Sequence, residues 1–244
     1  MSAFMYADDL ILLSPSILGL QHMVDLCCKE FAGIDLKLNN AKSTCMRIGP
    51  RWHRKCVSIH TENGPIDWVK ETTYLGVTLV AGPKFKISLD NCKTNFYSSF
   101  NAIYSQLGKV NSIFVTLKLI STIAVPCLMY SIEAVPFSKS FMRALEHPWT
   151  RVFNKIFSTF DADTILGCQF FSGYLPLEHV ARTRKVKFLS DMMSSSCYYI
   201  RSIVSLTGNE ELEAIAERYA VDVPYVIKNC HEIALKSVET QVGL

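Results

Sequence analysis

The chain has 244 residues, of which 49% are hydrophobic and 19% are charged, and this composition excludes a generally disordered protein because a core can be built from it. The formal net charge of +3 is too small to identify a nucleic-acid-binding protein. The charge is unevenly distributed, however, since residues 1–40 carry a net charge of −3 and residues 41–118 carry +7. A basic stretch therefore follows an acidic start.

The cysteines and the apolar runs bear on the compartment in which the protein works. No two of the nine cysteines have C-x-x-C spacing, so we expect reduced thiols in an intracellular protein, nuclear or cytoplasmic. The longest strongly apolar run without a charge, 119–132, has 14 residues and contains Pro126. Because a membrane-spanning helix needs about 20 residues, we expect no transmembrane segment and no membrane partner.

The first predicted elements are two short strands, 4–7 and 10–13. The two aspartates between them interrupt the apolar pattern, which favours a β-hairpin with both carboxylates at its tip. Ser16 then fits the N-cap of a helix, because apolar residues follow it at helical spacing. We expect this helix to end near Gly33.

Short strands are predicted next, at 43–48, 56–61, 65–69 and 72–79. The segment 49–55 is a basic loop between the first two of them. An Asn-Gly turn signal separates the second from the third, which predicts a second hairpin.

After Gly82-Pro83 the spacing of the apolar residues becomes helical. The predicted helices cover approximately 96–107, 117–128, 139–158, 177–206, 208–219 and 224–239. The fold class expected is therefore α+β. It comprises a mixed region over 1–81, a helical region over 82–160 and a C-terminal helical region over 161–244.

The most specific motif is Phe4-Met5-Tyr6-Ala7-Asp8-Asp9. Two adjacent carboxylates repel each other unless a cation neutralises them, and Mg²⁺ is bound by such oxygen ligands. A pair of these ions stabilises the attacking and the leaving oxygen of a phosphoryl transfer. The alternative is an exposed turn, where aspartate is common. Tyr-Ala-Asp-Asp occurs by chance in roughly one chain per thousand of this length, which favours the metal site.

These residues resemble the C-terminal part of the reverse transcriptases of non-long-terminal-repeat (LINE-type) retrotransposons. Tyr6-Ala7-Asp8-Asp9 is similar to the third palm motif, the segment 33–43 to the motif that follows it, and Tyr74-Leu75-Gly76-Val77 to the primer grip. The three motifs occur in the order of the family. The resemblance covers about residues 3–80, and the helical region after it is similar to a thumb in character only.

The resemblance implies a partial polymerase palm followed by a thumb, and an RNA-directed DNA polymerase that uses Mg²⁺, an RNA template, a DNA primer and deoxynucleotides. Asp8 is then the principal metal ligand and Asp9 an accessory one, while Tyr6 lies near the primer end. Lys42 lies near the incoming triphosphate, where its cation assists departure of the pyrophosphate. The alternative for Lys42 is a solvated loop lysine.

The same resemblance implies that Tyr74, Leu75 and Gly76 form a tight turn against the primer backbone, although an ordinary strand corner gives the same pattern. In this family the fingers and the first two palm motifs precede the Tyr-Ala-Asp-Asp hairpin. We therefore expect the chain to be catalytically incomplete alone, as a truncated or decayed product or as one piece that needs the N-terminal part of the polymerase. We also expect apolar faces of the partial palm to be uncovered.

Two sets of basic residues are candidates for nucleic-acid contacts. Lys93 and Lys109 belong to the thumb-like region, where lysines contact phosphates without reading sequence. Arg182, Arg184 and Lys185 form a denser cluster within a predicted helix. The alternative for both sets is a solvated helix face. Two other functions stay open for the whole chain: a non-catalytic nucleic-acid-binding module that uses 41–118, and a helical interaction module.

Overall fold

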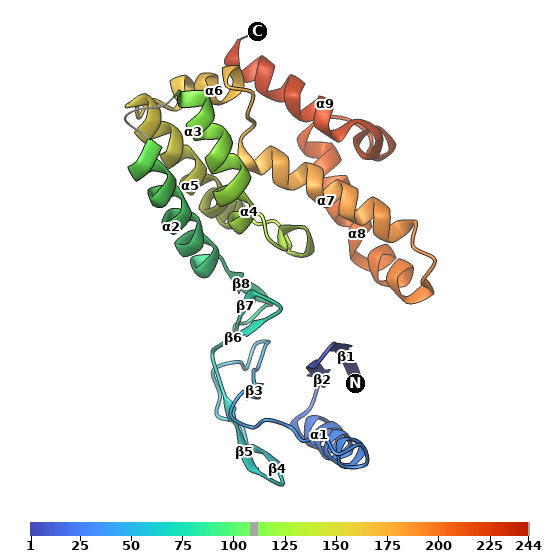
Figure 1. Cartoon of the computed structure of the whole chain (residues 1–244). Coiled ribbons are helices and arrows are strands. Elements are labelled where there is room, and N and C mark those ends of the chain that lie inside the picture. The colour runs from blue at the N-terminus through green and yellow to red at the C-terminus, as the bar shows by residue number, and fades with distance from the viewer. Residues whose placement is uncertain (108–111, 244) are drawn as a thin grey trace. The chain divides into compact units, whose positions relative to one another are not determined.

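The computed structural model describes residues 1–107 and 112–243, and the chain divides into two compact units, 1–88 and 89–244 (Figure 1). The first unit is built from short strands and one long helix, and the second from helices. This arrangement confirms the α+β class. The boundary between the two units lies after Ser88, whereas the predicted boundary lay between residues 81 and 82. The difference arises because a further strand, β8 (Lys86–Ser88), follows Gly82-Pro83.

The N-terminal hairpin forms as predicted. Strands β1 (Ser2–Tyr6) and β2 (Asp9–Leu13) pair in antiparallel register, with Tyr6 opposite Asp9. The turn therefore consists of two residues, and its first residue, Ala7, has a φ of 52°. A left-handed conformation at alanine costs about 1–2 kcal/mol, so pairing of the strands must hold this turn in place.

Helix α1 (Ile17–Ala32) also begins and ends as predicted. The Ser16 hydroxyl accepts a hydrogen bond from the Gly19 N–H over 3.1 Å, and Gly33 follows the last turn. Val24 is the buried residue of this helix, and it packs in a small cluster with residues of the next sheet.

That sheet consists of β3 (Thr44–Cys45), β4 (Ile59–Thr61) and β5 (Gly64–Trp68), in the order β3-β5-β4. The strands β4 and β5 form the predicted second hairpin, whereas β3 is shorter than expected and pairs parallel to β5. The buried residues of this unit's core are Val24, Cys45, Ile59 and Ile66.

The prediction of one strand over 72–79 is wrong. The segment forms two antiparallel strands, β6 (Glu71–Tyr74) and β7 (Val77–Val80), and β8 pairs with the far side of β7. Leu75 and Gly76 reverse the chain with φ values of 46° and 77°. Two consecutive residues with positive φ make a tight hairpin turn, and leucine rarely adopts this conformation, so residue preferences alone do not predict the turn.

The helical unit begins with α2 (Asp90–Leu107). The remaining elements follow in chain order: α3 (Ile113–Leu119), the π-helical turn η1 (Ile120–Ala124), α4 (Val125–Leu128), the 3₁₀ turn η2 (Ile132–Ala134), α5 (Lys139–Phe157), α6 (Ala162–Phe171), α7 (Leu177–Met193), α8 (Tyr198–Arg218) and α9 (Val223–Val242). The predicted core stripes are buried, from Phe96 and Phe100 on α2 to Leu117 and Leu128 on the next helical stretch. The helix widens at η1 just before Pro126, which has no N–H to donate to an α-helical ladder.

Two helical predictions need correction. The chain turns between Met193 and Tyr198, so that α7 ends earlier than predicted and α8 runs on through Gly208. A Cβ at Gly208 would lie 2.6 Å from Cγ1 of Val204 and 3.3 Å from Cδ2 of Leu189. Glycine is therefore required here for close packing and does not end the helix. Helix α6 was not predicted, although Asp161 caps it by accepting from the Thr164 N–H over 2.8 Å.

Among the described residues, one helical stretch, Ile113–Ala134, is long and apolar enough to cross a membrane by length and composition. Core helices of soluble proteins meet the same criterion. Here Leu117, Ile120, Ala124 and Leu128 are fully buried in the cluster that α2 and α5 share. One side of the stretch therefore packs in the core, while about a third of its most apolar window is buried in all.

Candidate metal and nucleic-acid sites

The two carboxylates are presented at the tip of the β1–β2 hairpin. Asp8 is the second residue of the turn and Asp9 is the first residue of β2, and both side chains are exposed. Over residues 1–107 and 112–243, no hydrogen bond or ion pair engages either carboxylate. Tyr6, the residue opposite Asp9, is 67% exposed beside them. The tip can therefore accept a cation without losing an existing contact.

The pair fits part of a magnesium site. Mg²⁺ in phosphoryl-transfer sites is held by one or two carboxylates, keeps several waters and takes the remaining ligands from substrate phosphates. No group of three or more His, Cys, Asp or Glu side chains suited to a metal is found in the described part of the chain. Asp8 and Asp9 would therefore hold the ion from one side, with further ligands from substrate or from another polypeptide segment.

Lys42 lies in a turn whose shape depends on Asn39. The Lys42 N–H donates to the carbonyl and to Oδ1 of Asn39 over 3.1 and 3.2 Å, and the Ser43 hydroxyl donates to the same carbonyl over 2.9 Å. The Lys42 side chain is exposed and, as far as the structure describes the chain, is in no ion pair. It is therefore available to a bound anion.

The turn that carries Lys42 is also fixed from outside. The Asn40 amide donates to Thr61 Oγ1 over 2.7 Å and to the Gly64 carbonyl over 3.0 Å, which joins the turn to the β4–β5 hairpin. Leu38 before this turn and Leu12 of β2 pack against the same buried cluster. Strand β2 and the segment before the lysine turn thus contact one core, although Asp8 and Asp9 form no hydrogen bond or ion pair with Lys42.

The third motif forms the turn between β6 and β7. Tyr74 is half-buried at the end of β6, whereas Leu75 and Gly76 are exposed at the turn itself. The tight turn implied by the resemblance is therefore present, and contact of this turn with a primer stays a prediction.

Large apolar side chains are exposed on the N-terminal unit, as expected for a partial palm. Phe4 and Met5 are successive residues of β1 and therefore lie on opposite faces of the hairpin, yet they are 53% and 71% exposed. Other exposed apolar residues of this unit include Leu13, Leu18, Ile34, Leu36 and Val57. Both faces of this two-stranded sheet therefore carry exposed apolar surface.

The prediction that Arg182, Arg184 and Lys185 bind nucleic acid is wrong for Lys185, which is 4% exposed. Its ammonium group lies 2.6 Å from the Glu211 carboxylate, donates to the Val135 carbonyl over 3.2 Å and lies over the Phe137 ring. A cation enclosed by a carboxylate, a carbonyl and an aromatic ring is neutralised within the fold and cannot reach a phosphate.

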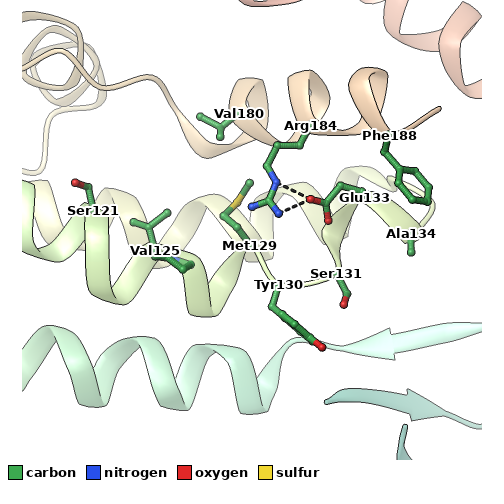
Figure 2. Close-up of a pocket in the computed structure, with 11 residues that line it drawn as sticks. Ser121, Val125, Met129, Tyr130, Ser131, Glu133, Ala134, Val180, Arg184 and Phe188 are labelled. Atoms are coloured by element: carbon green, nitrogen blue, oxygen red, sulfur yellow. Dashed lines mark hydrogen bonds and ion pairs between the residues drawn. The ribbon is translucent and has the colours of Figure 1, made fainter. Parts of the chain in front are cut away.

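The two arginines of this cluster are also paired with acidic residues. Arg182 is nearly buried and lies 3.4 Å from Glu178. Arg184 donates from Nε to Glu133 Oε1 over 2.6 Å, and Figure 2 shows the two side chains pointing toward each other across the wall of a cavity. The cluster therefore joins helices within its unit, and the charge of its members is offset by Glu178, Glu133 and Glu211.

The structure says less about the two thumb-region lysines that were predicted to contact nucleic acid. Lys93 is half-buried near the start of α2, so part of its side chain can reach a phosphate. Lys109 lies outside the described residues.

Sequence reasoning missed a polar network between α5, α7 and α8. The Glu146 carboxylate accepts from the Glu178 N–H over 3.0 Å, and His179 Nδ1 lies 2.8 Å from the Tyr219 hydroxyl. Burial raises the pKa of Glu146 to about 7, although the hydrogen bond from the Glu178 N–H opposes the shift. Burial lowers the pKa of His179 to about 4, against the attraction of Glu178. These residues are far apart in sequence and form no motif, so only the fold brings them together.

The cavities formed by the described residues include two near charged side chains. One, of about 600 Å³, lies between the η1–η2 stretch and α7 and is lined mainly by apolar side chains together with the Arg184–Glu133 pair (Figure 2). The other, of about 470 Å³, lies between α1 and β4. Burial, and then the charges of Glu62 and Asp25, raise the pKa of Cys28 in this second cavity, which disfavours a nucleophilic thiolate there.

A scan against protein-family models gave no match, and searches of curated proteins and of solved structures gave none either.

Proposed function

We propose that the chain is part of a reverse transcriptase of a non-long-terminal-repeat retrotransposon, in which 1–81 contributes to the palm and the helices of 82–160 act as a thumb. The observation that carries the proposal is the Tyr-Ala-Asp-Asp motif on a two-residue hairpin turn, with both carboxylates exposed and without partners in the described structure. The anchored Lys42 turn and the tight turn at Leu75 and Gly76 support it, because each occurs in the family's order.

In this function Asp8 and Asp9 hold Mg²⁺, which when bound neutralises the phosphates of the incoming deoxynucleotide. Lys42, on its fixed turn, offsets the negative charge of the departing pyrophosphate. Tyr6 and Tyr74 contact the primer or the nucleotide, and Gly76 allows the primer backbone a close approach. The partners are an RNA template and a DNA primer in an intracellular compartment, nuclear or cytoplasmic.

The enzyme is proposed to be incomplete in this chain alone. Two adjacent carboxylates provide one side of a metal site, and a two-metal reaction needs further carboxylate ligands. The exposed apolar faces of β1 fit a position against another part of a palm. We therefore expect the missing ligands to come from polypeptide that carries the preceding palm motifs.

A primer-extension assay tests this proposal. With a primed RNA template, Mg²⁺ and deoxynucleotides, the chain alone should give no extension, and addition of a polypeptide with the preceding palm motifs should restore it. Asp8→Asn should abolish the restored activity, whereas Asp67→Asn, at an exposed aspartate of the same unit, should not. Activity that persists in Asp8→Asn, or no activity with any such polypeptide, contradicts the proposal.

A second candidate is a nucleic-acid-binding module without catalysis. It is favoured by the basic residues of the N-terminal unit, which form no ion pairs within the described structure. Binding of primed template without extension in the complemented assay would support this second function.

A further inference from the structure

One end of the β6-β7-β8 sheet is positively charged. At the end remote from the β6–β7 turn, Lys86 pairs with Val80, and the Ala81 N–H donates to the Lys70 carbonyl over 2.8 Å. Lys70 and Lys86 therefore flank β7 on both sides, and Lys84 lies in the connection between β7 and β8. All three side chains are exposed.

The basic loop 49–55 is attached to the same end of the sheet. The Gly49 N–H donates to the Gly82 carbonyl over 2.8 Å, which joins the loop to the β7–β8 connection. The base of the loop is closed where Arg47 Nη1 donates to Cys56 Sγ over 3.0 Å. Two segments some thirty residues apart in the sequence are thus joined at Gly49 and Gly82, and both carry exposed cations.

We call this region the cation surface, and its members are the exposed residues Arg51, Arg54, Lys55, Lys70, Lys84 and Lys86. None of the six forms an ion pair in the described part of the chain. Glu71, opposite Val80 in β6, is the acidic residue of this end of the sheet and offsets part of the charge. This differs from the Arg182–Lys185 cluster, in which each cation has an acidic partner.

Aromatic side chains accompany these cations. Phe85 is 51% exposed between Lys84 and Lys86, and Trp52 packs edge-to-face with the exposed His53 in the attached loop. Proteins that hold single strands combine cations for the phosphates with aromatic side chains on which unpaired bases stack. An exposed phenylalanine between two lysines can stack on a base while the lysines contact the neighbouring phosphates.

We infer that the cation surface binds single-stranded nucleic acid, with the basic side chains on the phosphates and Phe85 against a base. This site goes beyond the proposed polymerase function because it needs neither Mg²⁺ nor the Asp8-Asp9 tip. The four residues of β7 separate it from the Leu75–Gly76 turn by about 13 Å. A single strand of a few nucleotides is therefore long enough to extend along the sheet from one end to the other.

The first experiment measures binding of the full chain to a fluorescent 20-nucleotide RNA by anisotropy, in EDTA, from 50 to 300 mM NaCl. Each neutralised phosphate contact lowers the slope of log K against log[salt] by about 0.7 for a single strand. The triple variant Arg51→Gln/Arg54→Gln/Lys55→Gln removes three such contacts, so it should make the negative slope shallower by about 2 and weaken binding at least tenfold at 50 mM NaCl.

The matched control removes the same charge from the helical unit. Lys139→Gln/Lys187→Gln/Lys228→Gln changes three exposed lysines that form no ion pairs in the described structure, and it should leave the slope unchanged. Equal losses from both triple variants would show that net charge alone attracts the RNA. That result, or an unchanged slope in the loop variant, overturns the inference.

Phe85→Ala tests the stacking contact. It should weaken RNA binding about 5- to 20-fold without changing the salt slope, because one base loses its aromatic partner and no phosphate contact is lost. Phe160→Ala, at another exposed phenylalanine in the helical unit, is the control and should have no effect. Equal effects of the two variants, or none from Phe85→Ala, contradict the stacking contact.

Two further measurements separate this inference from its alternatives. Asp8→Asn/Asp9→Asn should bind RNA normally in EDTA, so that failure of the polymerase assay with intact RNA binding overturns the proposed function alone. Vesicles of phosphatidylcholine and phosphatidylglycerol should not displace the RNA at equal phosphate concentration. Displacement that the loop variant abolishes would assign the cation surface to a membrane and overturn the inference.

Discussion

The Glu146 carboxylate of α5 accepts a hydrogen bond from the Glu178 N–H in the first turn of α7, over 3.0 Å. Helix α7 begins after Pro176, which has no side-chain group to cap it, so a residue from another helix satisfies this backbone donor. The same burial that allows this contact raises the pKa of Glu146 to about 7. A helix start is thereby coupled to a group that titrates near neutral pH.

Replacement of this carboxyl should change the pH dependence of stability. Because the folded state holds the Glu146 proton up to about pH 7 and the unfolded state releases it near pH 4.5, this group's contribution to the free energy of unfolding falls as pH rises between these values. Glu146→Gln cannot titrate, so its stability relative to wild type should increase by about 3 kcal/mol from pH 4.5 to pH 7.5. Urea unfolding at several pH values measures the difference. A difference that does not vary with pH contradicts the raised pKa.

His179 should give the opposite pH dependence. Burial lowers the pKa of His179 to about 4, so the unfolded state binds a proton near pH 6.5 while the folded state does not. Stability from this group is present above pH 6.5 and is lost as pH falls to about 4. His179→Gln should therefore lose less stability than wild type between pH 6.5 and pH 4.5, as measured by urea unfolding. His231→Gln, at an exposed histidine, should behave as wild type.

The buried ion pair of Lys185 is expected to be important for stability. Lys185→Ala should cost about 2–3 kcal/mol, because it leaves the Glu211 carboxylate with no cation and removes a donor to the Val135 carbonyl. Lys187→Ala, at an exposed lysine of the same helix, should change stability by less than about 0.5 kcal/mol. A double-mutant cycle with Glu211→Gln measures the pair directly, and a coupling energy near zero would contradict this account.

Substitution of alanine for two glycines within helices should change stability in opposite directions. Gly208→Ala should destabilise the helical unit by about 1–3 kcal/mol, because the added Cβ meets Val204 at 2.6 Å. Gly167→Ala should stabilise α6 by about 0.5–1 kcal/mol, because nothing lies within 4 Å of its Cβ and alanine favours helix. Thermal unfolding of the two variants compares them, and equal effects would show that helix propensity outweighs packing at Gly208.

The cysteines should differ in reactivity toward a thiol reagent at pH 8. Cys197 is exposed and should be modified first, whereas burial raises the pKa of Cys45 to about 11 and should make it slow in the folded protein. Cys197→Ser should remove the fastest phase of the reaction. Rapid modification of Cys45 would show that the core of the N-terminal unit opens readily.

Local patterns were sufficient to predict much of the fold. The Ser16 cap, the apolar spacing of α2 and the stripe from Leu117 to Leu128 each depend on residues close in sequence, and each is found as predicted. The turn at Leu75 was not predictable from residue preferences, since leucine seldom has positive φ. The close packing of Gly208 was not predictable either, because one of its neighbours, Leu189, belongs to another helix.

For the candidate sites too, features that depend on residues close in sequence were predictable and features that depend on distant contacts were not. The acidic tip was predictable because its two carboxylates are adjacent and flanked by strands. The pairing of Arg184 and Lys185 was not, because their acidic partners Glu133 and Glu211 are far away in the sequence. The cation surface also depends on a distant contact, between Gly49 and Gly82. The charge of a basic segment thus says little until its neighbours in the fold are known.

The outer edge of β1 has a practical consequence for work with this protein. Strand β1 pairs with β2 alone, and its residues Ser2–Tyr6 include neither a charge nor a proline that would hinder edge-to-edge association. We expect concentrated samples to aggregate first through this strand. Met5→Lys should slow that aggregation, because a lysine in the middle of the edge repels a second copy of the same hairpin.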